Sequence, residues 1–201
     1  MAHKFDPQNI KKLDSEQRRA IMPPTETLIR LGLKASDTMA DIGSGIGYFT
    51  IPAAQMLASA NSVTTPAIVY ALDTSADMLE EIQARTVSLG LSNIRYSLTE
   101  EYDFKLPDAS VSFALICNVL HEVDDKPRFL KEASRLLQPG GILAVIEWHK
   151  RPTMGGPPQD ERIASEALGD YIEQAGLIQI QAFNFTENFY AMTAFRGIAH
   201  V

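Results

Sequence analysis

Gly43, Gly45 and Gly47 stand at alternate positions between a short apolar run and a helical pattern, and Asp41 precedes them by two residues. Glycines at such a junction let the backbone turn tightly and let a ligand approach the main chain closely. In open α/β sheets, ligands bind beyond the carboxyl ends of the strands, where the strand order reverses. The segment 41–48 therefore predicts a ligand site at the end of a first strand.

The glycine spacing distinguishes this loop from two common nucleotide-binding loops. A dinucleotide loop has the pattern G-x-G-x-x-G, whereas this loop has G-x-G-x-G followed by Tyr48. A P-loop needs a lysine directly after its glycines, and none follows Gly47. The carboxylate of Asp41 would repel a pyrophosphate and attract a cation. A cationic ligand is therefore favoured; a nicotinamide-dependent oxidoreductase is the alternative enzyme, and a binding protein without turnover is the non-enzymatic alternative.

Side chains that can bind a ligand or transfer a proton also follow later apolar runs. Asp73 ends the run 67–72, and its carboxylate can accept hydrogen bonds from two hydroxyls at once. His121 and Glu122 follow the run 111–116. A histidine with an ordinary pKa near 6.5 can take a proton from a substrate, or it can simply bond a loop carbonyl.

Three further features permit two interpretations each. Trp148, after the run 142–147, can line an acceptor pocket or pack in the core. The glycine- and proline-rich segment 153–160 can be a lid or a linker. The pair Arg18-Arg19 can bind an anionic substrate, although a solvated helix face is the more ordinary role.

Short apolar runs alternate with helical patterns from residue 38 onward, which predicts a parallel sheet with helices on both faces. The predicted strands cover residues 38–42, 67–72, 94–98, 111–116 and 142–147. The predicted helices between them cover residues 48–58, 75–89 and 127–137. Ser75 is a suitable N-cap for the second of these helices, and Gly90 is a suitable stop.

The end of the chain has a different pattern. A helix capped by Ser165 and ended by Gly176 precedes two strands, 178–185 and 189–195. The short link between these strands permits only an antiparallel hairpin, because a parallel pair needs a crossover of about a dozen residues or more. The predicted fold class is α/β, with a doubly wound seven-stranded sheet that is mostly parallel and carries one antiparallel strand.

A short segment precedes the first strand. Pro23-Pro24 begin a short helix that stops at Gly32. The expected division of the chain is a helical cap segment at 1–37 and a main domain at 38–201.

The glycine loop and the motifs after it resemble the class I S-adenosylmethionine-dependent methyltransferases, most closely the methyltransferase type 11 subgroup. Residues 41–47 resemble motif I of that family, and residues 70–79 resemble its second strand and the continuation of that strand. Further matches flank the fourth strand and precede the fifth, at residues 106–116, 118–122 and 136–141. The resemblance covers about residues 23–195 and implies a Rossmann-like fold.

The resemblance implies transfer of a methyl group from S-adenosylmethionine to a small-molecule acceptor by in-line displacement, with S-adenosylhomocysteine as the product. The cofactor contacts that it implies come from Asp41, Gly43, Ser44, Gly45, Gly47, Asp73, Thr74, Met78, Glu100, Glu101 and Asn118. The acceptor-side residues that it implies are His121, Glu122 and Trp148.

Within these sets, Asp73 would bond both ribose hydroxyls, and Thr74 and Met78 would flank the adenine. Met78 also suits an ordinary core position of a helix. His121 is the candidate catalytic base. Transfer by proximity alone, to an acceptor that is already deprotonated, is the alternative.

The sequence departs from the family pattern at three places. Ser112 stands where the family usually has an aspartate at the start of the fourth strand. Thr99-Glu100-Glu101 replace a common G-D-A, so the adenine contact is open between the two glutamates. The connection 58–66 is longer and more polar than usual.

Charge and composition disfavour several classes of protein. A net charge of −7 disfavours a nucleic-acid surface, which needs clustered lysine and arginine. Cys117 is the one cysteine of the sequence, so neither an intrachain disulfide nor a thiolate metal cage can form, and no metal is expected. Its place in a predicted strand suits packing better than nucleophilic catalysis. The chain starts without a long apolar run, and no stretch approaches the roughly 20 apolar residues of a membrane span. The expectation is a cytoplasmic protein without nucleic-acid or membrane partners, its oligomeric state open, a homodimer included.

Overall fold

The structure is a computed structural model, and it describes residues 14–59, 67–153 and 155–198. The chain divides into two compact units, with the boundary between Lys105 and Leu106. Three of the segments discussed above extend outside the described residues: the start of the predicted cap segment, most of the connection 58–66, and Met154 in the segment 153–160.

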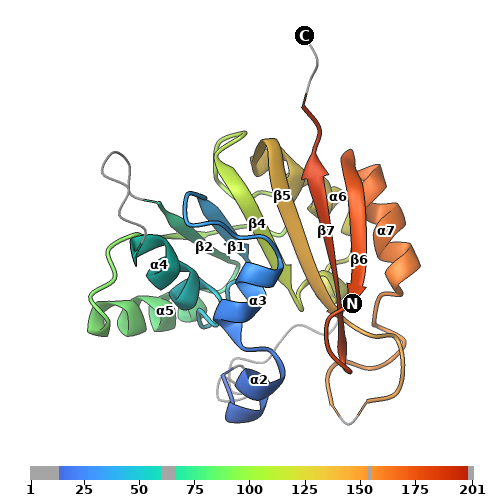
Figure 1. Cartoon of the computed structure of the whole chain (residues 1–201), viewed down its shortest axis with the longest axis horizontal. Helices are drawn as coiled ribbons and strands as arrows, with labels where there is room; N and C mark the ends of the chain where they lie inside the picture. Colours follow the sequence, from blue (N-terminus) through green and yellow to red (C-terminus); the bar gives the residue numbers. More distant parts are fainter. Residues whose placement is uncertain (1–13, 60–66, 154, 199–201) are drawn as a thin grey trace. The chain divides into compact units, whose positions relative to one another are not determined.

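The described residues of the first unit form three parallel strands in the order β3-β2-β1. They are β1 (Met39–Ile42), β2 (Val69–Asp73) and β3 (Ile94–Leu98). α4 (Thr50–Ser59) connects β1 to β2, and α5 (Ala76–Ser88) connects β2 to β3 (Figure 1). Both crossovers step in the same direction, and such crossovers are right-handed, so both helices cover the same face of these strands.

Two short helices precede β1, namely α2 (Glu16–Ile21) and α3 (Pro24–Arg30). α3 confirms the short helix predicted at the proline pair. The sequence placed Arg18-Arg19 on a helix face without giving bounds for that helix. The structure forms it as α2, whose N-terminus is capped by the Ser15 hydroxyl accepting the Arg18 N–H at 3.2 Å. None of the residues of α2 itself is buried, whereas Met22 at its C-cap is completely buried and fixes the end of the helix in the core.

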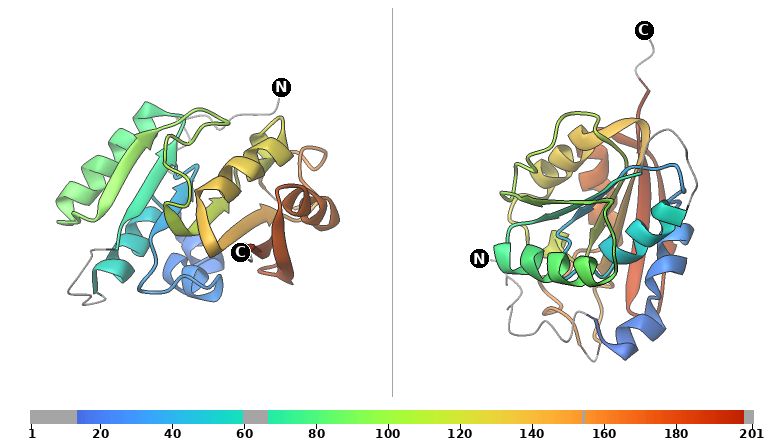
Figure 2. Two further views of the ribbon diagram at one scale, coloured as in Figure 1. Left: turned by 90° about the horizontal axis from the view of Figure 1, so that it is seen from above. Right: turned by 90° about the vertical axis from the view of Figure 1, so that its left-hand side faces the viewer.

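The second unit contains four strands within its described residues, in the order β4-β5-β7-β6. They are β4 (Val111–Cys117), β5 (Leu137–Trp148), β6 (Leu177–Asn184) and β7 (Phe189–Arg196). β4 and β5 are parallel, and β7 lies antiparallel between β5 and β6. α6 (Lys126–Leu136) follows β4, α7 (Ser165–Gln174) follows β5, and these two helices pack against each other (Figure 2).

The described residues thus carry the seven strands of the predicted α/β fold, and β7 is the single reversed strand. The predicted fold class is confirmed. Two local predictions were wrong. β5 begins at Leu137 rather than at 142, because the chain at Gly140 and Gly141 bulges and stays beside β4 instead of leaving the strand. The N-cap of α7 is Ala164, and Ser165 is already the first helical residue.

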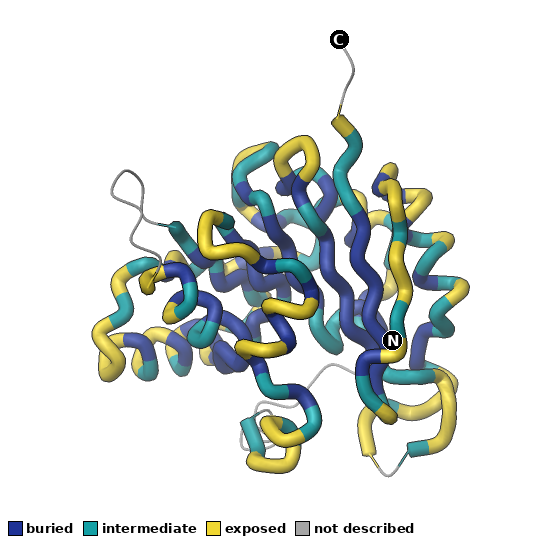
Figure 3. Tube along the Cα trace, viewed as in Figure 1, coloured by how far each residue is buried: buried dark blue, intermediate teal, exposed yellow. Residues whose placement is uncertain are grey.

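Burial distinguishes the central strands from the edge (Figure 3). β7 is buried continuously from Phe189 to Ala194, whereas most of β6 is half-buried or exposed. The register between β6 and β7 shifts between Ile178 and Gln181, and Gln179 has a left-handed φ of 54°. Such a bulge interrupts the free edge of a sheet and disfavours the addition of a further strand there.

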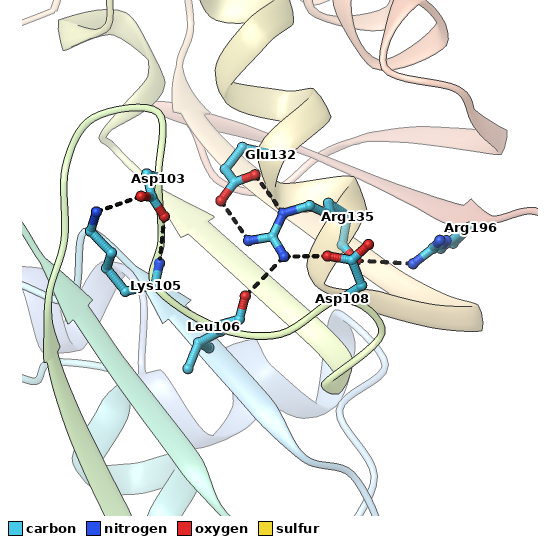
Figure 4. Close-up of polar contacts among 7 residues, drawn as sticks. All are labelled: Asp103, Lys105, Leu106, Asp108, Glu132, Arg135 and Arg196. Carbon is cyan, nitrogen blue, oxygen red and sulfur yellow. Dashed lines mark hydrogen bonds and ion pairs between the residues drawn. The ribbon is translucent and has the colours of Figure 1, made fainter.

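Arg135 on α6 fixes the segment that leads into β4 (Figure 4). Its guanidinium donates to both carboxylate oxygens of Glu132 at 2.7 Å, to the Leu106 carbonyl at 2.8 Å and to Asp108 at 2.6 Å. The Arg135 carbonyl in turn accepts the Ala109 N–H at 3.0 Å. The motif at 106–108 therefore serves to dock the entrance of β4 on α6.

Candidate functional site

The glycine loop of the first unit leaves β1 in a conformation that requires glycine. Gly43, Gly45 and Gly47 have φ values of 72°, 53° and 84°, in the left-handed region that side chains disfavour. The N–H groups of Gly43 and Ser44 donate to the Leu72 carbonyl at 2.8 and 3.0 Å. The loop is therefore tied to the end of β2 by its own backbone.

Asp73, the last residue of β2, holds the same loop through its side chain. One carboxylate oxygen accepts the Gly45 N–H at 2.8 Å, and the other accepts the Ser75 N–H at 2.9 Å. Burial raises the pKa of Asp73 above its ordinary value, against these hydrogen bonds, which lower it. A carboxylate oxygen accepts more than one hydrogen bond, so Asp73 retains capacity for the hydroxyls of a ligand.

Asp41 places a second carboxylate at this end of the strands. Its side chain is only 3% exposed, and one of its oxygens accepts the Thr50 hydroxyl at 2.6 Å. Burial raises the pKa of Asp41 to about 6, against the Thr50 hydrogen bond, and the charge of Asp73 contributes to the increase. A buried carboxylate that is still mostly ionised at pH 7 is a strong attractor for a cationic group.

Ser44 supports a ligand at this loop. Its hydroxyl is buried and has no hydrogen-bond partner among the described residues, and the residue is 6% exposed. Buried hydroxyls are rarely left unsatisfied in folded proteins, so a ligand is the natural partner. Two carboxylates and an available hydroxyl match a ligand that carries an ammonium group and sugar hydroxyls, as S-adenosylmethionine does.

The predicted adenine side is partly open to solvent. Thr74 is exposed, and Met78 is 5% exposed on the inner side of α5. The carboxylate of Glu100 is exposed and accepts the Lys105 ammonium at 3.1 Å, whereas Glu101 is half-buried. The adenine contacts remain predictions.

A second polar cluster lies at the carboxyl ends of β4 and β5 in the second unit. His121 lies in a short 3₁₀ helix (Leu120–Glu122), and its Nδ1 is 2.8 Å from Oε2 of Glu147 on β5. The backbone N–H of His121 donates to the other Glu147 oxygen at 3.2 Å, and the Trp148 N–H donates to Oε2 at 3.3 Å. Glu147 is completely buried, so its carboxylate serves the protein rather than solvent.

This arrangement sets the chemistry of His121. Burial acts to lower the pKa of His121, but the hydrogen bond and charge of Glu147, with the charges of Glu122 and Glu161, raise it above its ordinary value. Since Glu147 only accepts, neutral His121 carries its proton on Nδ1 and presents a lone pair on Nε2. Oε1 of Glu122 lies 3.9 Å from this Nε2.

Asn118 marks the exit from β4. Its backbone has a left-handed φ of 57°, and its N–H donates to the Ile146 carbonyl at 2.9 Å. Its side-chain oxygen is buried and has no hydrogen-bond partner within the described part of the chain. Asparagine tolerates this conformation better than most residues, which fits its place at a sharp turn with an unpaired acceptor.

Trp148 packs against the loop that follows β5. Its ring centroid lies 4.3 Å from that of Phe189, and the Arg162 guanidinium lies 5.2 Å from the indole. A Cβ on Gly156 would lie 2.8 Å from the indole, so this position needs glycine. Arg162 donates to the carbonyls of His149, Arg151, Gly155 and Pro157. The described part of the loop is therefore anchored on Trp148 and Arg162.

Three residues of these clusters, Glu147, Thr50 and Arg162, were not predicted from the sequence. Glu147 is the last residue of the predicted strand 142–147, and a carboxylate at the end of an otherwise apolar strand was the available signal for a paired group. Thr50 and Arg162 gave no such signal, because their roles depend on contacts made in the folded chain.

The described residues offer neither a cluster of metal ligands nor a helix suited to span a membrane. Across residues 14–59, 67–153 and 155–198, no group of three or more His, Cys, Asp or Glu side chains is placed to bind a metal ion. None of the helices formed by those residues combines the length and apolar character needed to cross a membrane.

Comparisons with known proteins agree with one another. The family model described as "Methyltransferase domain" matches residues 40–145. A curated relative, 27-O-demethylrifamycin SV methyltransferase of Amycolatopsis mediterranei, is 28% identical over 153 residues, which are 76% of this chain and 53% of that protein. Demethylmenaquinone methyltransferase of Geobacillus stearothermophilus is 28% identical over 139 residues, which are 69% of this chain and 56% of that protein. The chain thus spans about half the length of these curated relatives.

Solved structures give a longer match. A SAM-dependent methyltransferase from Aquifex aeolicus has a TM-score of 0.87 at 30% identity, covering 96% of this chain and 100% of that one. Phosphoethanolamine N-methyltransferase 2 of Haemonchus contortus, in complex with S-adenosyl-L-methionine, has a TM-score of 0.73 at 15% identity, covering 96% of this chain and 58% of that one. The second likeness concerns the fold alone.

Proposed function

The chain belongs to the class I S-adenosylmethionine-dependent methyltransferases, and on that premise we propose that it transfers a methyl group from S-adenosylmethionine to a small organic acceptor. The membership confirms the resemblance of residues 41–47 and of the later motifs. It does not favour a nicotinamide-dependent oxidoreductase or a non-catalytic binding protein.

The residues of the glycine loop are proposed to hold the cofactor. S-adenosylmethionine supplies a methyl group on a positively charged sulfur. Asp41 attracts its ammonium group, Ser44 and the loop backbone lie along its amino-acid and ribose portions, and Asp73 accepts from its ribose hydroxyls. Glu100 and Glu101 are both proposed for the adenine contact: Glu100 is exposed and pairs with Lys105, and Glu101 is half-buried.

His121 is proposed as the general base that takes the acceptor's proton on Nε2. Glu147 positions the ring and stabilises the imidazolium that forms, so His121 is oriented before any acceptor binds. Ligands in this fold class bind beyond the carboxyl ends of strands, which is where His121 and Glu147 lie. Glu122 and Trp148 are proposed to contact the acceptor, and Asn118 to contact the cofactor.

The acceptor is proposed to be a small molecule that carries an ionisable proton, because a base paired with a buried carboxylate is useful only for such an acceptor. The names of the relatives fit this size class, since one acts on a demethylrifamycin and another on a demethylmenaquinone. A cytoplasmic location, a cap role for residues 1–37 and a homodimeric assembly remain proposals.

The observation that carries this proposed function is the pair of carboxylates beside the glycine loop. Asp41 lies near the end of β1, and Asp73 ends the neighbouring strand β2. The experiment is a thermal shift with S-adenosylmethionine, S-adenosylhomocysteine, NAD and ATP. Stabilisation by the first two alone is expected, and stabilisation by NAD alone would contradict the proposal. Incubation with methyl-labelled S-adenosylmethionine and a metabolite extract then identifies the acceptor by the label that it gains.

A further inference from the structure

We propose that Arg18 binds the carboxylate of the amino-acid portion of S-adenosylmethionine, so that α2 forms part of the cofactor site. The proposal rests on the proposed function and adds to it a residue upstream of the matched methyltransferase domain, which begins at residue 40. From the sequence alone, the ordinary interpretation of Arg18 is a solvated position on a helix face; the proposal gives it a ligand instead.

Arg18 reaches the glycine loop through Tyr48, the residue that directly follows Gly47. The guanidinium carbon of Arg18 lies 4.1 Å from the centroid of the Tyr48 ring, which is the geometry of a cation–π contact. The Tyr48 hydroxyl donates to the Met22 carbonyl at 2.7 Å in a buried hydrogen bond. Tyr48 therefore fastens both the side chain of Arg18 and the end of α2 to the loop.

A second contact holds α2 from the other side. Asp14 accepts from Arg19 at 2.6 and 2.9 Å and from Arg85 on α5 at 3.4 Å. Arg85 also pairs with Glu81 at 2.8 Å. These polar contacts, the Tyr48 contacts and the completely buried Met22 at the C-cap together hold α2 in place.

The charges at the loop match an α-amino acid. Such a group is a zwitterion, with an ammonium and a carboxylate on one carbon. Asp41 supplies a buried negative charge, and Arg18 is near enough for its positive charge to oppose the upward shift of the Asp41 pKa. A ligand carboxylate that leaves water needs a charged donor, and a planar guanidinium pairs with it through two hydrogen bonds. The neighbouring Arg19 is committed to Asp14 and has a side chain that is 53% exposed.

A purely structural role for Arg18 makes a different prediction, which ligand chemistry can separate. If Arg18 only stacks on Tyr48, its loss affects every ligand of the loop equally. If Arg18 binds the carboxylate, its loss affects only ligands that carry one. Decarboxylated S-adenosylmethionine retains the sulfonium, the ammonium and the adenosine, so it differs from S-adenosylmethionine in this group alone.

The experiment is isothermal titration of both ligands into the full-length wild type, Arg18→Gln and Arg30→Gln. Arg30 is an exposed arginine of α3 in the same unit and serves as the charge-matched control. For S-adenosylmethionine, Arg18→Gln should weaken binding by about 10- to 100-fold, as expected for the loss of charged hydrogen bonds. For the decarboxylated ligand, the change should stay below about 2-fold, and Arg30→Gln should leave both affinities unchanged.

Arg18→Lys guards against a folding artefact, because it keeps the charge and removes the planar stacking surface. It should retain part of the preference for S-adenosylmethionine over the decarboxylated ligand. Equal weakening of both ligands by Arg18→Gln, or no weakening of either, would overturn the proposal. Failure of the wild type to bind either ligand would instead refute the proposed function.

Discussion

The carboxylate of Glu147 accepts two N–H groups of His121, one from the ring at 2.8 Å and one from the backbone at 3.2 Å. The ring and the backbone of one residue are thus held by one buried side chain from the neighbouring strand. Such a double contact fixes both the orientation and the tautomer of an imidazole, which a single contact to a mobile group would not achieve.

Glu147→Gln tests this pairing. A glutamine has one acceptor oxygen for the N–H groups that the carboxylate now accepts, so His121 should lose its orientation and its pKa should fall. We expect kcat to drop by about 10²–10⁴-fold, as for loss of general-base catalysis, with little change in the cofactor affinity. The pH–rate profile should shift to lower pH. Glu122→Gln, which changes a carboxylate 3.9 Å from Nε2, is compared for the pH profile alone, because Glu122 is also proposed to contact the acceptor; it should shift the profile less.

Full activity of His121→Ala across pH 6–9 would rule out a base at this position.

The His121–Glu147 pair also predicts a pH dependence of stability. Because the His121 pKa is raised in the folded protein above its value of 6.5, the pair stabilises the fold fully below pH 6.5. That contribution is lost as the pH rises through the raised pKa of His121. The acidic groups that raise this pKa are Glu147, Glu122 and Glu161. Chemical denaturation of wild type and His121→Gln at pH 5.5 and pH 9 measures this. The difference between the two proteins should be larger at pH 5.5.

Asp73→Ala should weaken S-adenosylmethionine binding by roughly 1.5–3 kcal/mol for each charged hydrogen bond that is lost. The fold should survive, because Asp73 ends a strand and is half-buried. Calorimetry on the folded variant gives the affinity, and circular dichroism checks the fold. Unchanged affinity in a folded variant would remove the ribose assignment. Asp77→Ala, at an exposed position of α5, is the matched control.

Asp41→Asn should stabilise the protein while it weakens cofactor binding. The folded pKa of Asp41 is about 6, above its ordinary 3.8, so stability decreases as the pH rises through this interval and the ionised carboxylate is unfavourable at pH 7. An asparagine can still accept the Thr50 hydroxyl and removes that cost, which amounts to roughly 1–3 kcal/mol. Thermal unfolding without ligand should show a higher Tm for the variant. Addition of S-adenosylmethionine should stabilise the variant less than the wild type.

Gly156→Ala should disturb the loop after β5. The added Cβ would meet the Trp148 ring at 2.8 Å, and φ at this position is 89°, which disfavours a side chain. We expect a loss of stability of about 1–3 kcal/mol and a change in the fluorescence of Trp148, the protein's one tryptophan. Gly155→Ala, where a Cβ meets nothing within 4 Å, is the control and should leave the fluorescence unchanged.

Local patterns made the strands and the glycine loop predictable. Alternation of apolar runs and helices, the cap at Ser75 and the short link before Phe189 each depend on neighbouring residues, and the structure confirms each of them. The predicted start of the fifth strand, at residue 142, was wrong. A bulge at Gly140 keeps the preceding residues paired with β4, and no local sequence pattern reveals such a bulge.

The polar clusters were less predictable, since they join residues that are distant in sequence. Glu147 lies 26 residues after His121, and their pairing depends on the register between β4 and β5. The contact between Arg18 and Tyr48 likewise depends on where the polar contacts of Asp14 place α2. Residue type alone marks such groups as capable of chemistry, and only the fold pairs them.

The two hydrogen bonds that Asp73 accepts from Gly45 and Ser75 have a kinetic consequence. They set the conformation of the glycine loop from within the protein, so association with a ligand need not include the entropic cost of ordering that loop. In the proposed cofactor site, Asp73 would contribute to recognition twice, by its own contact with the ligand and by holding the glycine loop. Variants at Asp73 should therefore slow association as well as hasten dissociation, whereas variants at Asp41 should change mainly the dissociation rate.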